Sequence, residues 1–357
     1  MSNRSVRVAR VAAVGVAVVS LASVTFGGQR PRAAAGNVES VDPNWTMPRM
    51  PDGTPDLQGM WTNNTITPLE RPEELGEQRA YTAEEAAVRE GRTLDRIAER
   101  AAPSDPNREV LSARDDNRPG GYNNFWIDSG TMVATVRGEK RTSLIIDPPN
   151  GRIPPRTETW QAWSDARAER RREGHGFDHP ELRPLGERCL LAFGSSSGPP
   201  MLPVLYNNHY QIVQNADYVM ILVEMVHDVR IIPLDGRPHP PPHIRKWMGD
   251  SVGHWEGDTL VVDTTNFHPE QDRYGPPDNL HVVERFTRID EGTILYEFTI
   301  DDPTMFAETW GGEIPVSLTD EPLYEYACHE GNYALPGILA GARQLEADEA
   351  AARDQSR

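Results

Sequence analysis

The second half of the chain is a succession of short apolar runs separated by tight turns, and this pattern restricts the possible folds more than any other feature. Connections such as Gln214–Asp217 and Asp290–Gly292 are short enough to require antiparallel neighbours. The pattern shows no alternation of strands with helices and no internal repeat. A long meander leaves exposed edges unless it closes, so we expect a mainly β, antiparallel barrel, with a two-sheet β-sandwich as the alternative. The nine expected strands are Tyr210–Asn215, Tyr218–Met225, Val229–Leu234, His254–Trp255, Thr259–Thr265, His281–Ile289, Thr293–Ile300, Glu308–Leu318 and Leu323–Cys328.

Two stretches of the first half predict helices peripheral to the barrel. Thr82 and Glu85 have the capping-box spacing, and good helix formers follow them to about residue 100. A second helix is expected over 159–173, with arginines near its C-terminus, where they oppose the helix dipole. We therefore expect one β-rich domain over 57–345 with helical insertions near 82–100 and 159–173. An extended lead-in over 36–56 precedes it, and a C-terminal helix ends in a frayed tail over 346–357.

The N-terminus predicts export. Three arginines precede an apolar run of 16 residues, and Ala33–Ala35 offers a small-residue cleavage site, so residues 1–35 are expected to be a signal peptide. The alternative is a single membrane anchor, but the run is shorter than the roughly 20 apolar residues that a spanning helix needs. Removing residues 1–35, which contain five arginines and no acid, moves the formal charge from −18 to −23. So acidic a surface repels nucleic acid, and we expect a periplasmic or extracellular protein.

The only two cysteines, Cys189 and Cys328, meet an oxidising environment after export. They are expected to form a disulfide, with two buried free thiols as the alternative. A bridge over so long a loop stabilises the fold by roughly 4 to 5 kcal/mol in the chain-entropy model.

Titratable residues collect where one apolar strand ends and the next begins. Glu224, His227 and Asp228 are the candidates for a general acid or base, and Arg230 for binding an anion. Alternation along an extended chain puts Glu224, Asp228 and Arg230 on one side of the sheet and His227 on the other. A purely structural pairing of Arg230 with a carboxylate is the alternative.

Four of the ten histidines fall between residues 224 and 267. His239 and His243 are separated by three prolines, which favour a polyproline II turn and point the two rings in different directions. This geometry argues against a metal site, and we name no metal ligands. We expect the segment from His239 to Asp250 to be a loop over the barrel mouth. His254 and His329 are the histidines expected to assist catalysis.

Aromatic and polar residues of the strands and their connections are candidates for lining a ligand cavity, and ordinary core packing is the alternative. Serine-nucleophile, zincin, P-loop and dinucleotide-binding motifs do not occur in the sequence, so we expect no cofactor. The candidate ligand-binding residues are Trp126, Trp247, Trp255, Asp263, Glu284, Phe286, Tyr296 and Tyr326.

Four long phrases resemble a family of exported, largely uncharacterised bacterial proteins: RTSLIIDPPNGRIPP, VHDVRIIPLDGRPH, GDSVGHWEGDTLVVDTTNF and LYEYACHEGNYALPGILAGAR. This resemblance covers about residues 45–345 and implies no particular activity. Two triplets, Gly59-Met60-Trp61 and Gly253-His254-Trp255, resemble the G-x-W signature of the calycins and lipocalins. That second resemblance implies a calycin-like barrel whose Trp packs across the floor.

Three functional hypotheses follow. The leading one is an exported barrel enzyme that acts on a small apolar or aromatic molecule by cofactor-independent acid–base chemistry, as an isomerase, cyclase, lyase or hydratase does. The second is a non-catalytic protein that binds a small hydrophobic ligand. The third is a metal-dependent hydrolase that uses the histidines. The sequence does not predict an oligomeric state.

Overall fold

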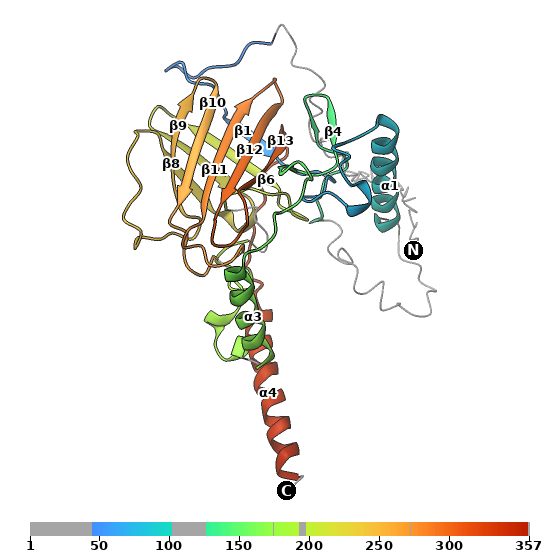
Figure 1. Cartoon of the computed structure of the whole chain (residues 1–357), viewed down its shortest axis with the longest axis vertical. Coiled ribbons are helices and arrows are strands. Elements are labelled where there is room, and N and C mark those ends of the chain that lie inside the picture. Colours follow the sequence, from blue (N-terminus) through green and yellow to red (C-terminus); the bar gives the residue numbers. More distant parts are fainter. Residues whose placement is uncertain (1–44, 102–125, 174, 193–197, 272, 356–357) are drawn as a thin grey trace, which may run out of the picture. The chain divides into compact units, whose positions relative to one another are not determined.

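Nine antiparallel strands form a nearly closed barrel in the computed structural model of the chain (Figure 1). The structure describes residues 45–101, 126–173, 175–192, 198–271 and 273–355, all within one compact unit that begins at Ala33. The predicted signal peptide and the first part of the lead-in lie outside these residues. The barrel strands are β1 (Gly59–Thr62), β6 (His209–Gln214), β7 (Tyr218–Val223), β8 (Val229–Pro233), β9 (Asp250–Glu256), β10 (Thr259–Thr265), β11 (His281–Arg288), β12 (Thr293–Asp301) and β13 (Trp310–Leu318).

The strands follow each other around the barrel in chain order, and β1 closes the ring by pairing with both β13 and β6. Each of the eight hydrogen-bonded junctions is antiparallel. With nine strands, eight antiparallel junctions force the ninth, between β8 and β9, to be parallel. Hydrogen-bonded pairing stops at this junction, which we call the seam.

Side chains confirm the parallel direction of the seam. Arg230, near the start of β8, donates to Ser251 Oγ, near the start of β9, at 3.3 Å. Further along, a Cβ on Gly253 would lie 2.8 Å from Ile232 Cγ2 and 3.0 Å from Leu234 Cδ2. Both strands therefore advance together, and the absence of a side chain at Gly253 allows their close approach.

The parallel seam explains the long proline-rich connection between β8 and β9. Parallel neighbours need a crossover that returns the chain to the same end of the sheet, whereas antiparallel neighbours need only a turn. Residues 234–249 provide this crossover, and four prolines favour its extended form. Figure 1 shows it as the yellow loop beside β8 and β9.

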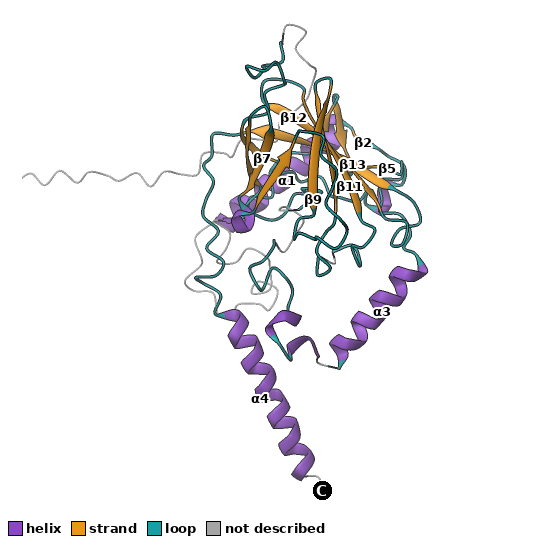
Figure 2. Cartoon of the chain, turned by 90° about the vertical axis from the view of Figure 1, so that its left-hand side faces the viewer, coloured by secondary structure: helices purple, strands orange, loops and turns teal. Residues whose placement is uncertain are grey.

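Smaller elements lie outside the barrel (Figure 2). A three-stranded sheet joins β2 (Ala80–Tyr81), β4 (Glu139–Arg141) and β3 (Thr135–Val136), and β5 (Ile145–Asp147) pairs with β13. Arg141 of this sheet forms a fully buried ion pair with Glu313 on the outer face of β13. The helices are α1 (Ala83–Ala101), α3 (Glu158–Arg172) and α4 (Ala334–Gln355), with short 3-10 turns η1 (Glu73–Leu75), η3 (His175–Phe177), η4 (Pro180–Leu182) and η5 (Met225–His227).

The barrel with peripheral helices is confirmed, and the sandwich does not form. The capping box is also confirmed, because Thr82 N–H donates to Glu85 and Glu85 N–H donates to Thr82 Oγ1. One strand prediction is wrong: residues 323–328 have no strand partner, and β1 occupies the place beside β13. The C-terminal helix α4 continues through Gln355.

Cys189 and Cys328 form the predicted disulfide, with their Cα atoms 5.7 Å apart and 139 positions apart in the chain. This pair fits an oxidising compartment. Within the part of the chain that the structure describes, no helix is long and apolar enough to cross a membrane.

Candidate functional site

The turn between β7 and β8 has an unusual backbone. Val226 and His227 both have positive φ values, 62° and 44°. A β-branched residue such as Val is strained in this region, and such strain is typical of functional turns. The turn interrupts the extended chain, so Glu224 and Arg230 do not share a side as alternation predicted. Arg230 lies inside the barrel, whereas Glu224 reaches His209, whose neighbour Tyr210 lies in the core.

Four titratable side chains meet beside this turn, and we call them the His209 cluster: His209, Glu224, Asp128 and Glu321. His209 Nδ1 lies 3.0 Å from Glu224 Oε2 and 3.8 Å from Asp128 Oδ2, and His209 Nε2 lies 3.6 Å from Glu321 Oε2. His209, Glu224 and Asp128 are buried, whereas Glu321 is half-buried. One imidazole is thus surrounded by three carboxyl groups.

Further hydrogen bonds fix the members of the His209 cluster. Glu224 Oε1 accepts from Tyr324 N–H at 3.1 Å, and Asp128 Oδ1 accepts from Asn64 Nδ2 at 2.7 Å. The buried side chain of Asn208 donates to the carbonyl of Asp128. These bonds connect the ends of β6 and β7 with three segments far away in the sequence, so the cluster is rigidly positioned.

The surroundings favour the charged forms of His209 and Glu224. Burial alone would lower the pKa of His209, but the hydrogen bond to Glu224 and the three nearby carboxyl groups outweigh it and raise this pKa. Burial alone would raise the pKa of Glu224, but the hydrogen bonds from His209 and from Tyr324 N–H hold it below its usual value. Each of the two side chains therefore favours the charged form of the other.

Asp228, at the other end of the same turn, has the opposite behaviour. Burial raises the pKa of Asp228 to about 7, and no hydrogen-bond partner for its buried Oδ2 exists among the described residues. Its carbonyl accepts from Val223 N–H at 2.8 Å, next to Glu224. Two carboxyl groups flanking one turn thus have pKa values pushed apart, an arrangement typical of acid–base sites.

Exposed aromatic side chains border the His209 cluster. Trp126 is 52% exposed, and its ring meets the half-exposed ring of Tyr324 edge to face at 6.4 Å. Tyr324 is the residue whose N–H binds Glu224. Tyr326 is half-buried and packs against the core. Of the predicted ligand-binding residues, Trp126 is therefore the one near the cluster with an accessible ring.

Four predicted site residues lie inside the barrel. Arg230 is 3% exposed and Glu284 is fully buried; Arg230 Nη1 donates to Glu284 Oε1 at 2.9 Å, and Nη2 contacts Oε2. Tyr296 Oη donates to the same Oε1 at 2.9 Å, and the ring of Phe286 packs on Tyr296. These side chains fill the barrel centre, so the role of Arg230 as a substrate anchor does not fit its position.

The outer wall of β9, β10 and β11 carries a second titratable group. His239 of the crossover contacts Asp250 Oδ2 and Asp263 Oδ1, both at 2.9 Å, and Asp263 Oδ2 lies 2.6 Å from His281 Nε2. Lys246 also pairs with Asp250. The crossover is therefore attached along the outer wall, and the prediction of a loop over the barrel mouth is wrong.

No group of three or more His, Cys, Asp and Glu side chains is arranged to hold a metal ion within the described residues. The remaining predicted residues lie apart from the His209 cluster. His254 is on the outer face of β9 beside Glu256, and Trp247 stacks on His268. Trp255 packs against the core and His329 is exposed in the turn after Cys328.

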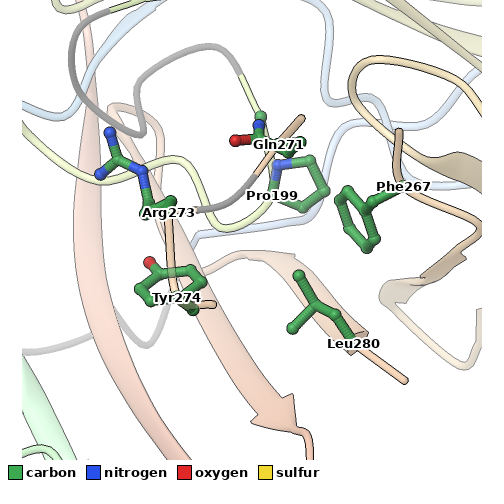
Figure 3. A pocket seen from close by; sticks show the side chains of 7 residues that line it. Pro199, Phe267, Gln271, Arg273, Tyr274 and Leu280 are labelled. Carbon is green, nitrogen blue, oxygen red and sulfur yellow. The ribbon is translucent and has the colours of Figure 1, made fainter. Parts of the chain in front are cut away.

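A cleft of about 440 Å³ lies outside the barrel, lined by residues of the segments 65–69 and 202–204 and by Leu144, Ser129, Arg96 and Arg273. Its volume falls within the range of small-molecule sites. A second pocket between Pro199, Phe267, Tyr274 and Leu280 has only about 10 Å³, room for one water molecule (Figure 3).

Sequence reasoning nominated Glu224 and Asp228 but missed His209, Asp128 and Glu321. The run Asn207-Asn208-His209 was the available signal, because two asparagines before a strand mark a turn with polar side chains at its end. Asp128 and Glu321 carry no such signal, since only the fold brings them to His209.

Comparisons of the chain with protein-family models, with curated proteins and with solved structures found no match in any of the three.

Proposed function

We propose that the protein is an exported enzyme that acts on a small organic molecule by acid–base chemistry at the His209 cluster. The observation that carries this proposal is the meeting of one buried imidazole with three carboxyl groups beside a strained turn and an exposed aromatic rim. The filled barrel centre supports a substrate bound outside the lumen. The disulfide supports an exported protein.

The proposed roles follow from the contacts. Glu224 holds the imidazole through Nδ1, so Nε2, which faces the half-buried Glu321, is the nitrogen that donates the proton to the substrate. Asp228, whose pKa of about 7 leaves it partly protonated at neutral pH, accepts or returns a proton. No redox step is required, which agrees with an isomerase, lyase or hydratase.

Proton exchange with solvent tests the proposal without knowledge of the natural substrate. Carbon acids such as 2-oxo acids, 3-hydroxy acids and cyclic ketones are incubated with the protein in D₂O, and loss of their C–H signals is followed by proton NMR. We expect at least one class to exchange with the wild type and not with His209→Gln or Glu224→Gln. Asp228→Asn should remove an inflection near pH 7 from the rate profile.

The matched control is His254→Gln, because the His254 side chain is exposed on the outer wall and Glu256 is its only side-chain hydrogen-bond partner among the described residues. Its exchange rate should equal that of the wild type. No exchange with any class, or equal loss in His254→Gln, would refute the proposal.

The cleft favours a second candidate function, a non-catalytic protein that binds a small ligand. Its partly apolar lining and its volume of about 440 Å³ suit such a ligand. Binding with unchanged C–H signals, and with no difference between the wild type and His209→Gln, would support this alternative.

A further inference from the structure

We propose that the 440 Å³ cleft is a binding site for a small organic anion with an apolar body, such as an aryl-substituted carboxylate. This inference goes beyond the proposed function, because none of the proposed acid–base residues His209, Glu224 and Asp228 lines the cleft. It depends on three properties of the cleft: its lining, its charge and its connection to the His209 cluster.

The lining selects for an apolar body. Ile66, Leu69, Leu144 and Leu202 contribute apolar side chains, together with prolines. The wall is rigid, because Leu144 N–H donates to Pro68 O at 2.9 Å and Ile66 N–H donates to Met132 O at 3.0 Å. Apolar surface that is already fixed in place loses little conformational freedom when a ligand covers it.

The hydroxyl groups of two lining threonines are already engaged by the protein. Thr65 Oγ1 donates to Met132 O at 2.9 Å, and Thr67 Oγ1 accepts from Ala134 N–H at 2.8 Å. The polar end of a ligand must therefore be recognised mainly by the charged side chains of the lining.

These charged side chains are two arginines, Arg96 from α1 and Arg273 from the segment between β10 and β11, and no lining residue is acidic. The positive charge of the lining is opposite to the net charge of the whole chain, which has 54 acidic and 36 basic residues. Arg96 donates to Thr93 Oγ1 at 3.4 Å and has no ion pair among the described residues. In Figure 3 the Arg273 guanidinium extends away from Phe267 and Leu280, the apolar side of the small pocket. A guanidinium presents paired N–H donors that match a carboxylate.

Three lining residues connect the cleft to the His209 cluster. Thr65 follows Asn64, which binds Asp128, and Ser129 follows Asp128 itself. The N–H and carbonyl of Val204 both bind the side chain of Asn208, the neighbour of His209. A ligand in the cleft is therefore next to the segments that position the acid–base residues.

Binding of defined probes tests the inference. Phenylacetate, its neutral counterpart phenylacetamide, and acetate are titrated into the full chain and followed by calorimetry and saturation-transfer NMR. We expect phenylacetate to bind about tenfold more tightly than phenylacetamide, since a charge-assisted pair replaces a neutral contact. Acetate, which lacks the apolar body, should bind at least tenfold more weakly than phenylacetate.

The variants Arg96→Gln and Arg273→Gln should each weaken phenylacetate binding by about tenfold and leave phenylacetamide binding unchanged. Arg170→Gln is the control, because it removes the same charge from an exposed position of α3 that is outside the lining. Circular dichroism checks that each variant is folded. Absent phenylacetate binding, equal affinity for the amide, or an equal loss in Arg170→Gln would overturn the inference.

The outcome separates this inference from the proposed function. His209→Gln should bind phenylacetate like the wild type, because His209 does not line the cleft. Binding that depends on the two arginines, without any proton exchange, would leave the anion site standing and refute the enzyme. Exchange at the His209 cluster without anion binding would refute the anion site and leave the proposed enzyme standing.

Discussion

Replacing Glu284 by glutamine tests whether the ion pair in the barrel centre is structural. Glu284 is fully buried, and its carboxylate accepts from both terminal nitrogens of Arg230 and from Tyr296 Oη. Glutamine keeps the shape but removes the negative charge, so the buried guanidinium loses its counter-charge. Breaking a buried pair in this way costs about 3 to 5 kcal/mol, and we expect the free energy of unfolding in guanidinium chloride to fall by that amount.

Two further variants sharpen this prediction. Adding Arg230→Met to Glu284→Gln removes the stranded cation as well, so the double variant should recover most of the lost stability. Glu256→Gln is the matched control, because its pair with Arg285 at 2.9 Å is 50% and 39% exposed and solvent screens it. A loss below about 1 kcal/mol for Glu284→Gln, or a double variant whose loss equals the sum of the single losses, would refute a structural pair.

Three other predictions concern stability. Replacing Cys189 and Cys328 together by serine should lower the free energy of unfolding by about 5 kcal/mol in the chain-entropy model, and an unchanged denaturation midpoint would contradict this. His281 forms a hydrogen bond with a carboxylate on β10, and this bond raises the pKa of the His281 imidazole above 6.5. The protonated imidazole therefore stabilises the fold fully below pH 6.5, and this stabilisation disappears as the pH rises through the raised pKa. The midpoint difference between the wild type and His281→Gln, measured across this range, should shrink as the pH increases. Gly253→Ala should cost about 1 to 3 kcal/mol by crowding β8, whereas Gly292→Ala, which meets no close neighbour, should change the midpoint little, and equal midpoints would exclude a tight seam.

The barrel was predictable because each strand carries its own local signal. Alternating burial, as in His281–Arg288, and short polar turns specify antiparallel neighbours without knowledge of the rest of the chain. The wrong strand at residues 323–328 has the same local composition, but β1 from the distant N-terminal part takes its place beside β13. Competition between distant segments for one edge is not encoded in the local pattern.

The candidate site was only partly predictable, for a related reason. Glu224 and Asp228 were found because they follow directly on an apolar strand. Alternation then misplaced Glu224 relative to Arg230, because the positive φ values of Val226 and His227 break the extended chain. His209 became a candidate only through three carboxyl groups, two of which come from remote segments of the chain.

The odd number of strands has a consequence for the histidine-rich crossover. All neighbouring strands of a closed barrel can be antiparallel only if the number of strands is even. A barrel of nine strands must therefore contain one parallel junction. In this barrel the parallel junction is the seam, where side-chain contacts take the place of backbone hydrogen bonds. Opening the barrel at the seam would therefore break the fewest hydrogen bonds. His239 lies on the segment that bridges the seam and contacts carboxylates of β9 and β10. The crossover around His239 therefore helps to hold the nine-stranded barrel closed at the seam. The proposed chemistry lies at the opposite end of β8.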